Sequence, residues 1–397
     1  MKTTIAAIEF GTSKIVTVVA SSGGMEKCEI IGSGTVSYDG YLTDGWNDPE
    51  HLKEKVQECI EAAEHETGVR IQEVYVGVPG AFIDVRNGEA EIELGDEEIG
   101  EDEMNAVQDC VADRLQIIED GGFVLHRSPA WFRVDDARET MAPLGSKGRK
   151  LSTSTSFITA KYDFIRDMTD LFGSLGITIL GFLSPSLGEA LLLLSIEDRD
   201  RTALLIDVGY LNTEISAIRG DAIVYHEVLP LGGGHITAEI ATELSIPMRA
   251  AEQLKRSYVF DADEFDRNGG TEIRGPEGRK ITFRREEVAP PADGQIDELC
   301  EMIEKCVRLH AGAHLEPRGQ IFLTGGGISM MRGAREHLSK KLARPVRMAQ
   351  ARSAKMNSPI FAAAMGLVDL VFDSIEQQEE DDGGFSGKIR LPLFKKG

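Results

Sequence analysis

Two segments of this chain, about half its length apart, repeat one pattern. In each, an apolar strand ends in an acidic residue, and one further residue, a glycine, a turn and a second strand follow. The two acids are Glu9 and Asp207. A carboxylate can hold a hydrated metal ion, and a turn without side-chain bulk can bring backbone N–H groups up to a phosphate. The repeat therefore predicts a nucleotide held between two similar halves.

Composition narrows the class of protein. The length of 397 residues exceeds that of one ordinary core, so we expect two or more domains. The formal net charge of -23 argues against nucleic acid as a partner. The five cysteines form no CxxC pair, and the most apolar stretch, 177–196, is interrupted by Ser184, Pro185 and Glu189. We therefore expect reduced thiols, no membrane-spanning segment and a cytoplasmic location.

Strand and helix patterns alternate along the chain, which favours an α/β fold. The pattern changes at 81–159, where short alternating strands at 82–85 and 89–94 surround one acidic helix, and we interpret this segment as an inserted α+β module. Later, 260–291 is polar with one strand at 280–284, and a helix is predicted at 297–310. A third glycine turn follows Thr324, and beyond Phe372 we expect an acidic linker and a basic tail.

The order of these motifs resembles that of the actin-like ATPase superfamily, whose members hold a nucleotide between two related domains. Three features are similar to one family within it, the bacterial cell-division protein FtsA. They are the run Gly-Thr-Ser-Lys-Ile at 11–15, the runs at 233–237 and 246–255, and the place of the inserted module. The resemblance implies an α/β, actin-like two-domain fold, with duplicated ribonuclease-H-like domains and an inserted α+β subdomain.

The resemblance also implies a division of the chain into parts that alternate between the two domains. In order, these are 1–80 (domain 1, first part), 81–159 (inserted subdomain), 160–200 (domain 1, continued), 201–235 (domain 2 core), 236–296 (domain 2 outer subdomain), 297–345 (domain 2 core, continued), 346–372 (domain 1, last part) and 373–397 (acidic linker and basic amphipathic tail).

By the same resemblance, the cofactor is ATP with Mg²⁺, which Glu9 and Asp207 hold through water. Glu252 and Lys255 match the residues that contact the ribose and the adenine. The cofactor-binding residues implied by the two phosphate loops, the connecting helices and the adenosine loop are Glu9, Gly11, Thr12, Ser13, Lys14, Asp207, Gly209, Asn212, Thr213, Glu252, Lys255, Gly325, Gly326 and Gly327.

Three departures from the family pattern bear on catalysis. Glu9 stands where the family has Asp, which moves the carboxylate by about one bond length, ~1.5 Å. Tyr210 and Leu211 stand where the second loop of the family is rich in glycine, and a Cβ limits the approach of the backbone to phosphate. Ser184 lies near the place where rapid hydrolases use Glu or Gln to orient water. We expect a weak ATPase at most, and the sequence identifies no catalytic residue.

The last 15 residues carry basic side chains and no acid, with Phe385, Ile389 and Leu393 at a helical spacing. Such a segment suits an anionic membrane surface, and FtsA has a membrane anchor at this place. Pro392 interrupts the helical pattern, so a disordered tail is the alternative. The residues assigned to the membrane tail are Phe385, Lys388, Ile389, Arg390, Leu393, Phe394, Lys395 and Lys396.

The strand at 280–284 is flanked by basic residues, namely Lys280, Arg284 and Arg285. A run of this kind is usually a solvated sheet edge. In FtsA this region lies in the subdomain that binds the C-terminal peptide of FtsZ, so the resemblance assigns these residues to partner binding.

The resemblance thus implies a scaffold that binds ATP, self-associates into filaments and tethers FtsZ filaments to the inner face of the cell membrane at the division site. Two alternatives stay open from the sequence. One is a nucleotide-independent adaptor, because the second loop has lost its glycines. The other is an actin-fold kinase of a small molecule, which the insertion and the tail disfavour.

Overall fold

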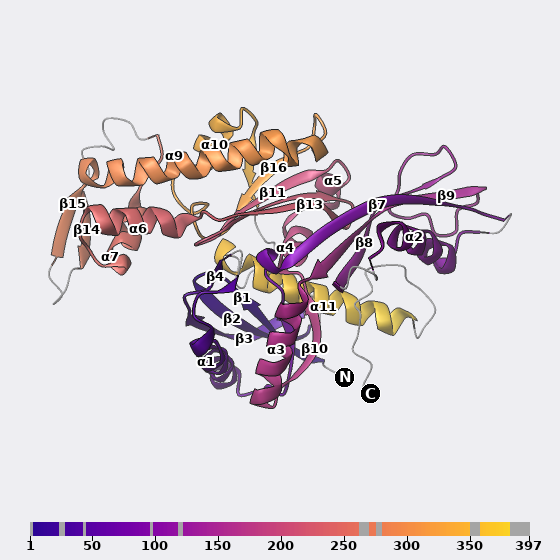
Figure 1. Cartoon of the computed structure of the whole chain (residues 1–397), viewed down its shortest axis with the longest axis horizontal. Helices are drawn as coiled ribbons and strands as arrows, with labels where there is room; N and C mark the ends of the chain where they lie inside the picture. Colours follow the sequence, from indigo (N-terminus) through magenta and orange to yellow (C-terminus); the bar gives the residue numbers. More distant parts are fainter. Residues whose placement is uncertain are drawn as a thin grey trace.

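The structure is a computed structural model, and its described residues are 3–23, 28–42, 45–95, 98–117, 122–261, 270–274, 280–349 and 358–381. Two five-stranded sheets form the centre of the molecule. One sheet lies in each half of the chain, and the inserted module extends to one side (Figure 1).

The two sheets have the same strand order. In each sheet, three strands that follow one another in the chain pair antiparallel, and two later strands run parallel to the first of the three in sequence. This shared order confirms that the chain is built from two related domains. The first sheet consists, in spatial order, of β3 (Cys28–Ser37), β2 (Lys14–Ser22), β1 (Thr4–Phe10), β6 (Glu73–Gly77) and β10 (Thr178–Leu183). The second consists of β13 (Ala222–Leu229), β12 (Thr213–Arg219), β11 (Ala203–Val208), β16 (Ile321–Thr324) and β17 (Val346–Met348).

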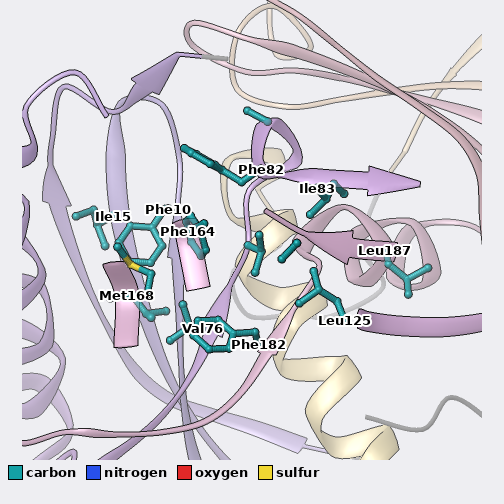
Figure 2. Packing of buried hydrophobic residues seen from close by; sticks show 14 of the residues in the cluster. Phe10, Ile15, Val76, Phe82, Ile83, Leu125, Phe164, Met168, Phe182 and Leu187 are labelled. Atoms are coloured by element: carbon teal, nitrogen blue, oxygen red, sulfur yellow. The ribbon is translucent and has the colours of Figure 1, made fainter. Parts of the chain in front are cut away.

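Helices α1 (Pro49–Thr67) and α3 (Tyr162–Leu175) belong to the first domain. The side chain of Asp48 caps the first turn of α1, and Gly68 ends it in the left-handed conformation with φ of 68°. Figure 2 shows that Phe10 of β1 packs beside Phe164 and Met168 of α3, and all three are buried. Burial of this apolar face holds the first hairpin rigidly on its domain. Two short strands, β4 (Tyr41–Leu42) and β5 (Gly45–Trp46), lie near this core.

The second domain carries an outer group of helices and one hairpin. These elements are α6 (Gly233–Glu243), α7 (Met248–Ser257), β14 (Gly270–Arg274), β15 (Lys280–Arg284), α9 (Arg285–Leu309), η3 (Ala311–His314) and α10 (Ala334–Lys341). The sequence predicted one strand and a helix from 297, whereas β15 pairs with a second strand, β14, and α9 already begins at Arg285. The carboxylate of Glu287 accepts the backbone N–H of Arg284 at 2.7 Å, which explains why α9 begins there despite Pro290 and Pro291.

The inserted module is a three-stranded sheet, β7 (Ile83–Glu93), β9 (Lys150–Ala160) and β8 (Phe123–Val134), with α2 (Glu101–Leu115) on one face. A short helix, η1 (Gly80–Phe82), leads into it. The two short strands predicted at 82–85 and 89–94 are one strand, because Gly88 continues the pairing with β9 and leaves room for Leu115 of α2.

The inserted module also contacts the second domain, along its edge strand β13. Ser156 donates its hydroxyl to the carbonyl of Ile223 at 2.6 Å, and the amide of Asn87 donates to the carbonyl of Val224 at 2.7 Å. Arg219, at the end of β12, forms an ion pair with Glu139 of the module. The module is therefore covalently part of the first domain and packed on the second.

Two helices connect the domains at the centre of the molecule, α4 (Pro185–Leu193) and α11 (Ala362–Asp381), as Figure 1 shows. They cross where Gly188 meets Gly366, and a Cβ on Gly366 would lie 2.3 Å from the backbone of Glu189. The short helices α5 (Ile196–Arg199) and η4 (Pro359–Phe361) flank them.

Part of the predicted linker beyond Phe372 is helical, because α11 continues to Asp381. The predicted membrane tail, 383–397, lies outside the described residues. Among the helices that the structure describes, none has the length and apolar character needed to cross a membrane.

The crossing of α4 and α11 predicts a position that tolerates no side chain. Gly366→Val should lower the free energy of unfolding by about 1–3 kcal/mol, because the new Cβ overlaps the backbone of α4. The matched control is Gly173→Ala in α3, where no atom lies within 4 Å of the added Cβ, and it should raise stability by up to about 1 kcal/mol. Urea denaturation of both variants provides the test, and equal effects would contradict the crossing.

Candidate nucleotide-binding site

The two acidic hairpins close in the same way and face each other. In the first turn the N–H of Gly11 donates to the carbonyl of Lys14 at 2.9 Å, and in the second the N–H of Gly209 donates to the carbonyl of Asn212 at 2.9 Å. The loops also touch, because the N–H of Leu211 donates to the hydroxyl of Thr12 at 2.9 Å. The structure thus brings the two predicted phosphate loops together between the domains.

A cavity of about 240 Å³ opens at this meeting point. Ten of the fourteen residues predicted to bind the cofactor line it, and they are Glu9, Gly11, Thr12, Ser13, Lys14, Asp207, Gly209, Glu252, Gly325 and Gly326. Asn212 lines a smaller cavity further in. Thr213, Lys255 and Gly327 line neither of these two cavities.

These last three residues support the site from behind. The hydroxyl of Thr213 donates to the carbonyl of Leu231 at 2.7 Å, and the N–H of Gly327 donates to the carbonyl of Val208 at 2.7 Å. Lys255 is buried, and its ammonium donates to the carbonyl of Gly233 at 3.1 Å and pairs with Glu252 at 2.8 Å. Lys255 therefore positions Glu252 at the wall of the cavity.

The third glycine turn approaches the second acid so closely that side chains do not fit. Gly325 has a φ of 86°, and a Cβ there would lie 2.0 Å from Oδ1 of Asp207. A Cβ on Gly327 would lie 2.3 Å from the carbonyl oxygen of Gly209. The glycines at these positions follow from the contact between the turn and the second phosphate loop.

Acidic side chains dominate the electrostatics of the cavity. Burial, together with the charge of Glu214, raises the pKa of Glu9 to about 7 against the opposing pull of Lys14. Burial and the charges of Glu214 and Glu9 raise the pKa of Asp207 to about 7 as well. Burial also raises the pKa of Glu189 well above its usual range. The site is thus short of positive charge.

Lys14 is one cation in this cavity, and protein groups hold it. Its ammonium donates to the carbonyl of Ile360 at 2.6 Å and lies 4.4 Å from the centre of the Phe361 ring. Burial lowers the pKa of Lys14, although Glu9 and Asp207 oppose that effect. An anionic ligand would therefore compete with the carbonyl of η4 for this side chain.

Tyr210 occupies the helix side of the second loop. Its ring carbon Cε1 lies 2.8 Å from the place of a Cβ on Gly234, and its carbonyl accepts the N–H of Gly234 at 2.6 Å. The N–H of Gly233 likewise donates to the carbonyl of Gly209 at 3.0 Å. The first N–H groups of α6 therefore bond to the second loop, and the missing glycines leave a bulkier loop that rests on α6.

Several residues of the site are not apparent from the sequence. Glu189 is a lone acid in an apolar helix, and that isolation was a signal of function or pairing. Glu214 and Ser186 are ordinary polar residues of a strand and a helix in the sequence, and only the fold places them at the cavity. The lining residues that were not predicted include Tyr41, Ser186, Glu189, Glu214, Arg256, Pro359 and Ile360.

The donor set fits a hydrated Mg²⁺ ion beside phosphate. Oδ1 of Asp207 is buried and has no hydrogen-bond partner among the described residues, so it is available as an acceptor. Glu9 faces it from the other loop, and carboxylate oxygen is the ligand type that Mg²⁺ prefers. Within the described ranges, no group of three or more His, Cys, Asp or Glu side chains is arranged to hold a metal ion.

The basic residues of β15 lie far from this cavity, in the outer part of the second domain. Lys280 pairs with Glu272 at 2.7 Å, and the side chain of Arg284 is 77% exposed. Arg285 instead contacts its own subdomain, since its guanidinium bonds to the carbonyl of Val259 and lies 5.4 Å from the Tyr258 ring. A separate cavity of about 560 Å³ lies beside Arg285 and Tyr258.

Comparison with known proteins identifies the family. The sequence model described as "Cell division protein FtsA" matches residues 204–366, and that of the "SHS2 domain inserted in FTSA" matches residues 80–159. The chain belongs to the FtsA family. It is therefore an actin-like cell-division protein.

Curated relatives and solved structures agree with this family. FtsA of Pseudomonas aeruginosa is 26% identical over 92% of this chain and 88% of its own length. FtsA of Bacillus subtilis is 24% identical over 91% and 82%, respectively. The PilM–PilN type IV pilus biogenesis complex has a TM-score of 0.62 at 18% identity, over 92% of this chain and 98% of that chain. MreB5 of Spiroplasma citri bound to AMPPNP has a TM-score of 0.54 at 12% identity, over 96% and 98%. The actin-like α/β fold is thus confirmed.

The crowded acids predict an unusual pH dependence of stability. Folding raises the pKa of Asp207 from 3.8 to about 7. The favourable contribution of protonated Asp207 to the free energy of unfolding is therefore fully present below the pKa of the unfolded chain, and it is lost as pH rises through about 7. Asp207→Asn should therefore raise the free energy of unfolding at pH 8, by about 1 kcal/mol or more, and less at pH 5. Urea denaturation without Mg²⁺ measures this difference.

The exposed Asp170 of α3 provides the control, because Asp170→Asn should change stability little at either pH. Equal gains for Asp207→Asn at pH 5 and pH 8 would contradict the raised pKa.

Proposed function

We propose that this protein is an ATP-binding cell-division scaffold with weak hydrolysis, which self-associates and tethers FtsZ filaments to the inner face of the cell membrane at the division site. One observation carries the ATP-binding part. Three glycine turns, from β1–β2, β11–β12 and the end of β16, converge on one cavity that also contains Lys14 and two opposed carboxylates.

Each wall of the cavity suits one part of ATP. The loop at Gly11–Ser13 and Lys14 offer small or cationic groups for the phosphates. Glu252, held by Lys255 and Arg256, offers its carboxylate to ribose hydroxyls. The flat turn at Gly325 and Gly326 leaves room for the sugar and the base. Glu9 and Asp207 would hold Mg²⁺ through water, and the ion would neutralise phosphate charge and relieve the repulsion between these two carboxylates.

Calorimetric titration with ATP and Mg²⁺ tests this proposal. Lys14→Ala should weaken binding about tenfold or more, because it removes a charge-assisted contact to phosphate. Gly325→Val should abolish binding, because its Cβ overlaps Asp207. The control Lys147→Ala, an exposed lysine of the inserted module, should leave the affinity unchanged. No heat at millimolar nucleotide with the unaltered chain would leave the nucleotide-independent adaptor.

The outer part of the second domain supports the partner-binding proposal. Lys280 and Arg284 are exposed on β15, next to the cavity of about 560 Å³ that α9, α10 and the segment after α7 line. We assign the C-terminal peptide of FtsZ to this surface, with Arg284 as a contact residue. Arg285 stabilises the surface from below, since its guanidinium packs on Tyr258.

Recruitment to vesicles separates the two tethering surfaces. On vesicles containing anionic lipid, the full chain should sediment and should carry FtsZ with it. Removal of residues 383–397 should abolish sedimentation of both proteins, because the basic amphipathic tail supplies the membrane contact. Arg284→Glu should leave the chain on the vesicles but lower the FtsZ carried with it severalfold. Arg308→Glu, an exposed change at the other end of α9, is the matched control. Unchanged sedimentation of the shortened chain would refute the tail assignment.

A further inference from the structure

A second, inner cavity of about 80 Å³ lies behind the phosphate loops. It shares Glu9, Gly11, Thr12 and Asp207 with the nucleotide cavity, so the two spaces meet at the loops. Its own walls are formed by Tyr41, Pro79, Gly80, Ser186, Asn212 and Glu214. The volume suits a few water molecules and is too small for a nucleotide.

Unpartnered polar atoms lie at this inner cavity. Asn212 is only 5% exposed, and neither atom of its amide has a hydrogen-bond partner among the described residues. Oδ1 of Asp207, at the same cavity, is also buried without such a partner. Buried polar groups left unpaired cost about 1–3 kcal/mol each, so these atoms favour ordered water in the cavity.

Glu214 reaches into the same space from β12, beside Asp207 in the strand pairing. Oε2 of Glu214 accepts the hydroxyl of Ser186 at 2.6 Å, which fixes the carboxylate against the first domain. The carboxylate also packs on Gly80, where a Cβ would lie 2.5 Å from it. Glu214 thus belongs to a strand of the second domain, and both of these side-chain contacts are with the first domain.

We propose that the inner cavity holds the water that attacks the terminal phosphate of ATP, and that Glu214 and Asn212 orient this water. The inference rests on the proposed binding of ATP, whose terminal phosphate would lie between the loops at Gly11–Ser13 and Gly209–Leu211. The water oxygen bonds to the terminal phosphorus, the bond from that phosphorus to the bridging oxygen breaks, and ADP leaves. Both water protons stay with the released phosphate, so ATP⁴⁻ and water give ADP³⁻ and H₂PO₄⁻.

Ser184, which stands near the place where rapid hydrolases of the superfamily orient water, has other contacts. It is fully buried, its N–H donates to Nε2 of His126 at 2.8 Å, and its hydroxyl accepts the N–H of Leu187 at 3.3 Å. It does not line the inner cavity, whereas Glu214 does. Slow hydrolysis in this chain therefore depends on a residue of the second domain.

Three substitutions separate a water-orienting role from a structural one. Glu214→Leu keeps the volume but removes the acceptor, and it should lower single-turnover phosphate release at least tenfold while the Kd for ATP changes less than about threefold. Glu214→Gln retains an acceptor and should restore most of the rate. Ser186→Ala breaks the same contact between the domains but keeps the carboxylate, so it should reduce release less than Glu214→Leu does. Glu243→Gln, an exposed change on α6, should leave rate and affinity unchanged.

The outcomes distinguish this inference from the proposed function. Absence of ATP binding by the unaltered chain would refute the proposed function itself. Binding without detectable phosphate release, or release by Glu214→Leu at the original rate, would refute only the role of Glu214. Equal losses in Ser186→Ala and Glu214→Leu would assign the effect to domain contact and overturn the water site. If Glu214→Leu unfolds at the assay temperature, Asn212→Leu repeats the test from the other wall of the cavity, with the same outcomes expected.

Discussion

Close approach of backbone segments at the centre of the molecule is the constraint on which the rest of the structure depends. The turn after β16 lies against the second phosphate loop, α6 begins against that same turn, and α4 crosses α11, each at a glycine. A Cβ on Gly233 would lie 2.5 Å from Gly327, and one on Gly188 would lie 2.5 Å from Gly366. Because no side chains separate these segments, the two sheets meet with their acidic hairpins face to face.

That geometry forces carboxylates together. Glu9, Glu189, Asp207 and Glu214 line one inner cavity. Lys14, whose charge opposes the rise in the pKa of Glu9 and Asp207, donates its hydrogen bond to the carbonyl of Ile360. A buried charge without compensation is costly. A divalent cation with a phosphate ligand would supply both the missing positive charge and an anion for Lys14. The free protein thus holds electrostatic strain that ligand binding would release.

The sequence predicted some elements and site residues of this structure and not others. The hairpin at Glu9 and its counterpart at Asp207 predicted the duplicated domains, because the apolar strand, acid and glycine are local signals. Gly325 was predicted for the same reason. Glu214 and Ser186 could not be found this way, since their importance arises from a contact across the cleft, between residues distant in sequence. The hairpin β14–β15 and the early start of α9 were missed because polar residues and two prolines conceal them, and Glu287 provides the cap that sustains the helix.

The contact of the inserted module with β13 links the module to the relative position of the two domains. The hydroxyl of Ser156 and the amide of Asn87 bond to backbone carbonyls of the second domain, while the module's own chain enters and leaves through the first. Any rotation of one domain against the other must therefore stretch or relieve these bonds. A ligand that bound the module and shifted its contact with β13 would therefore change the affinity of the cleft for its own ligand. By thermodynamic reciprocity, a ligand in the cleft would change the affinity of the module for its ligand by the same factor. The contact between the module and the edge strand β13 thus couples the module to the relative position of the two domains.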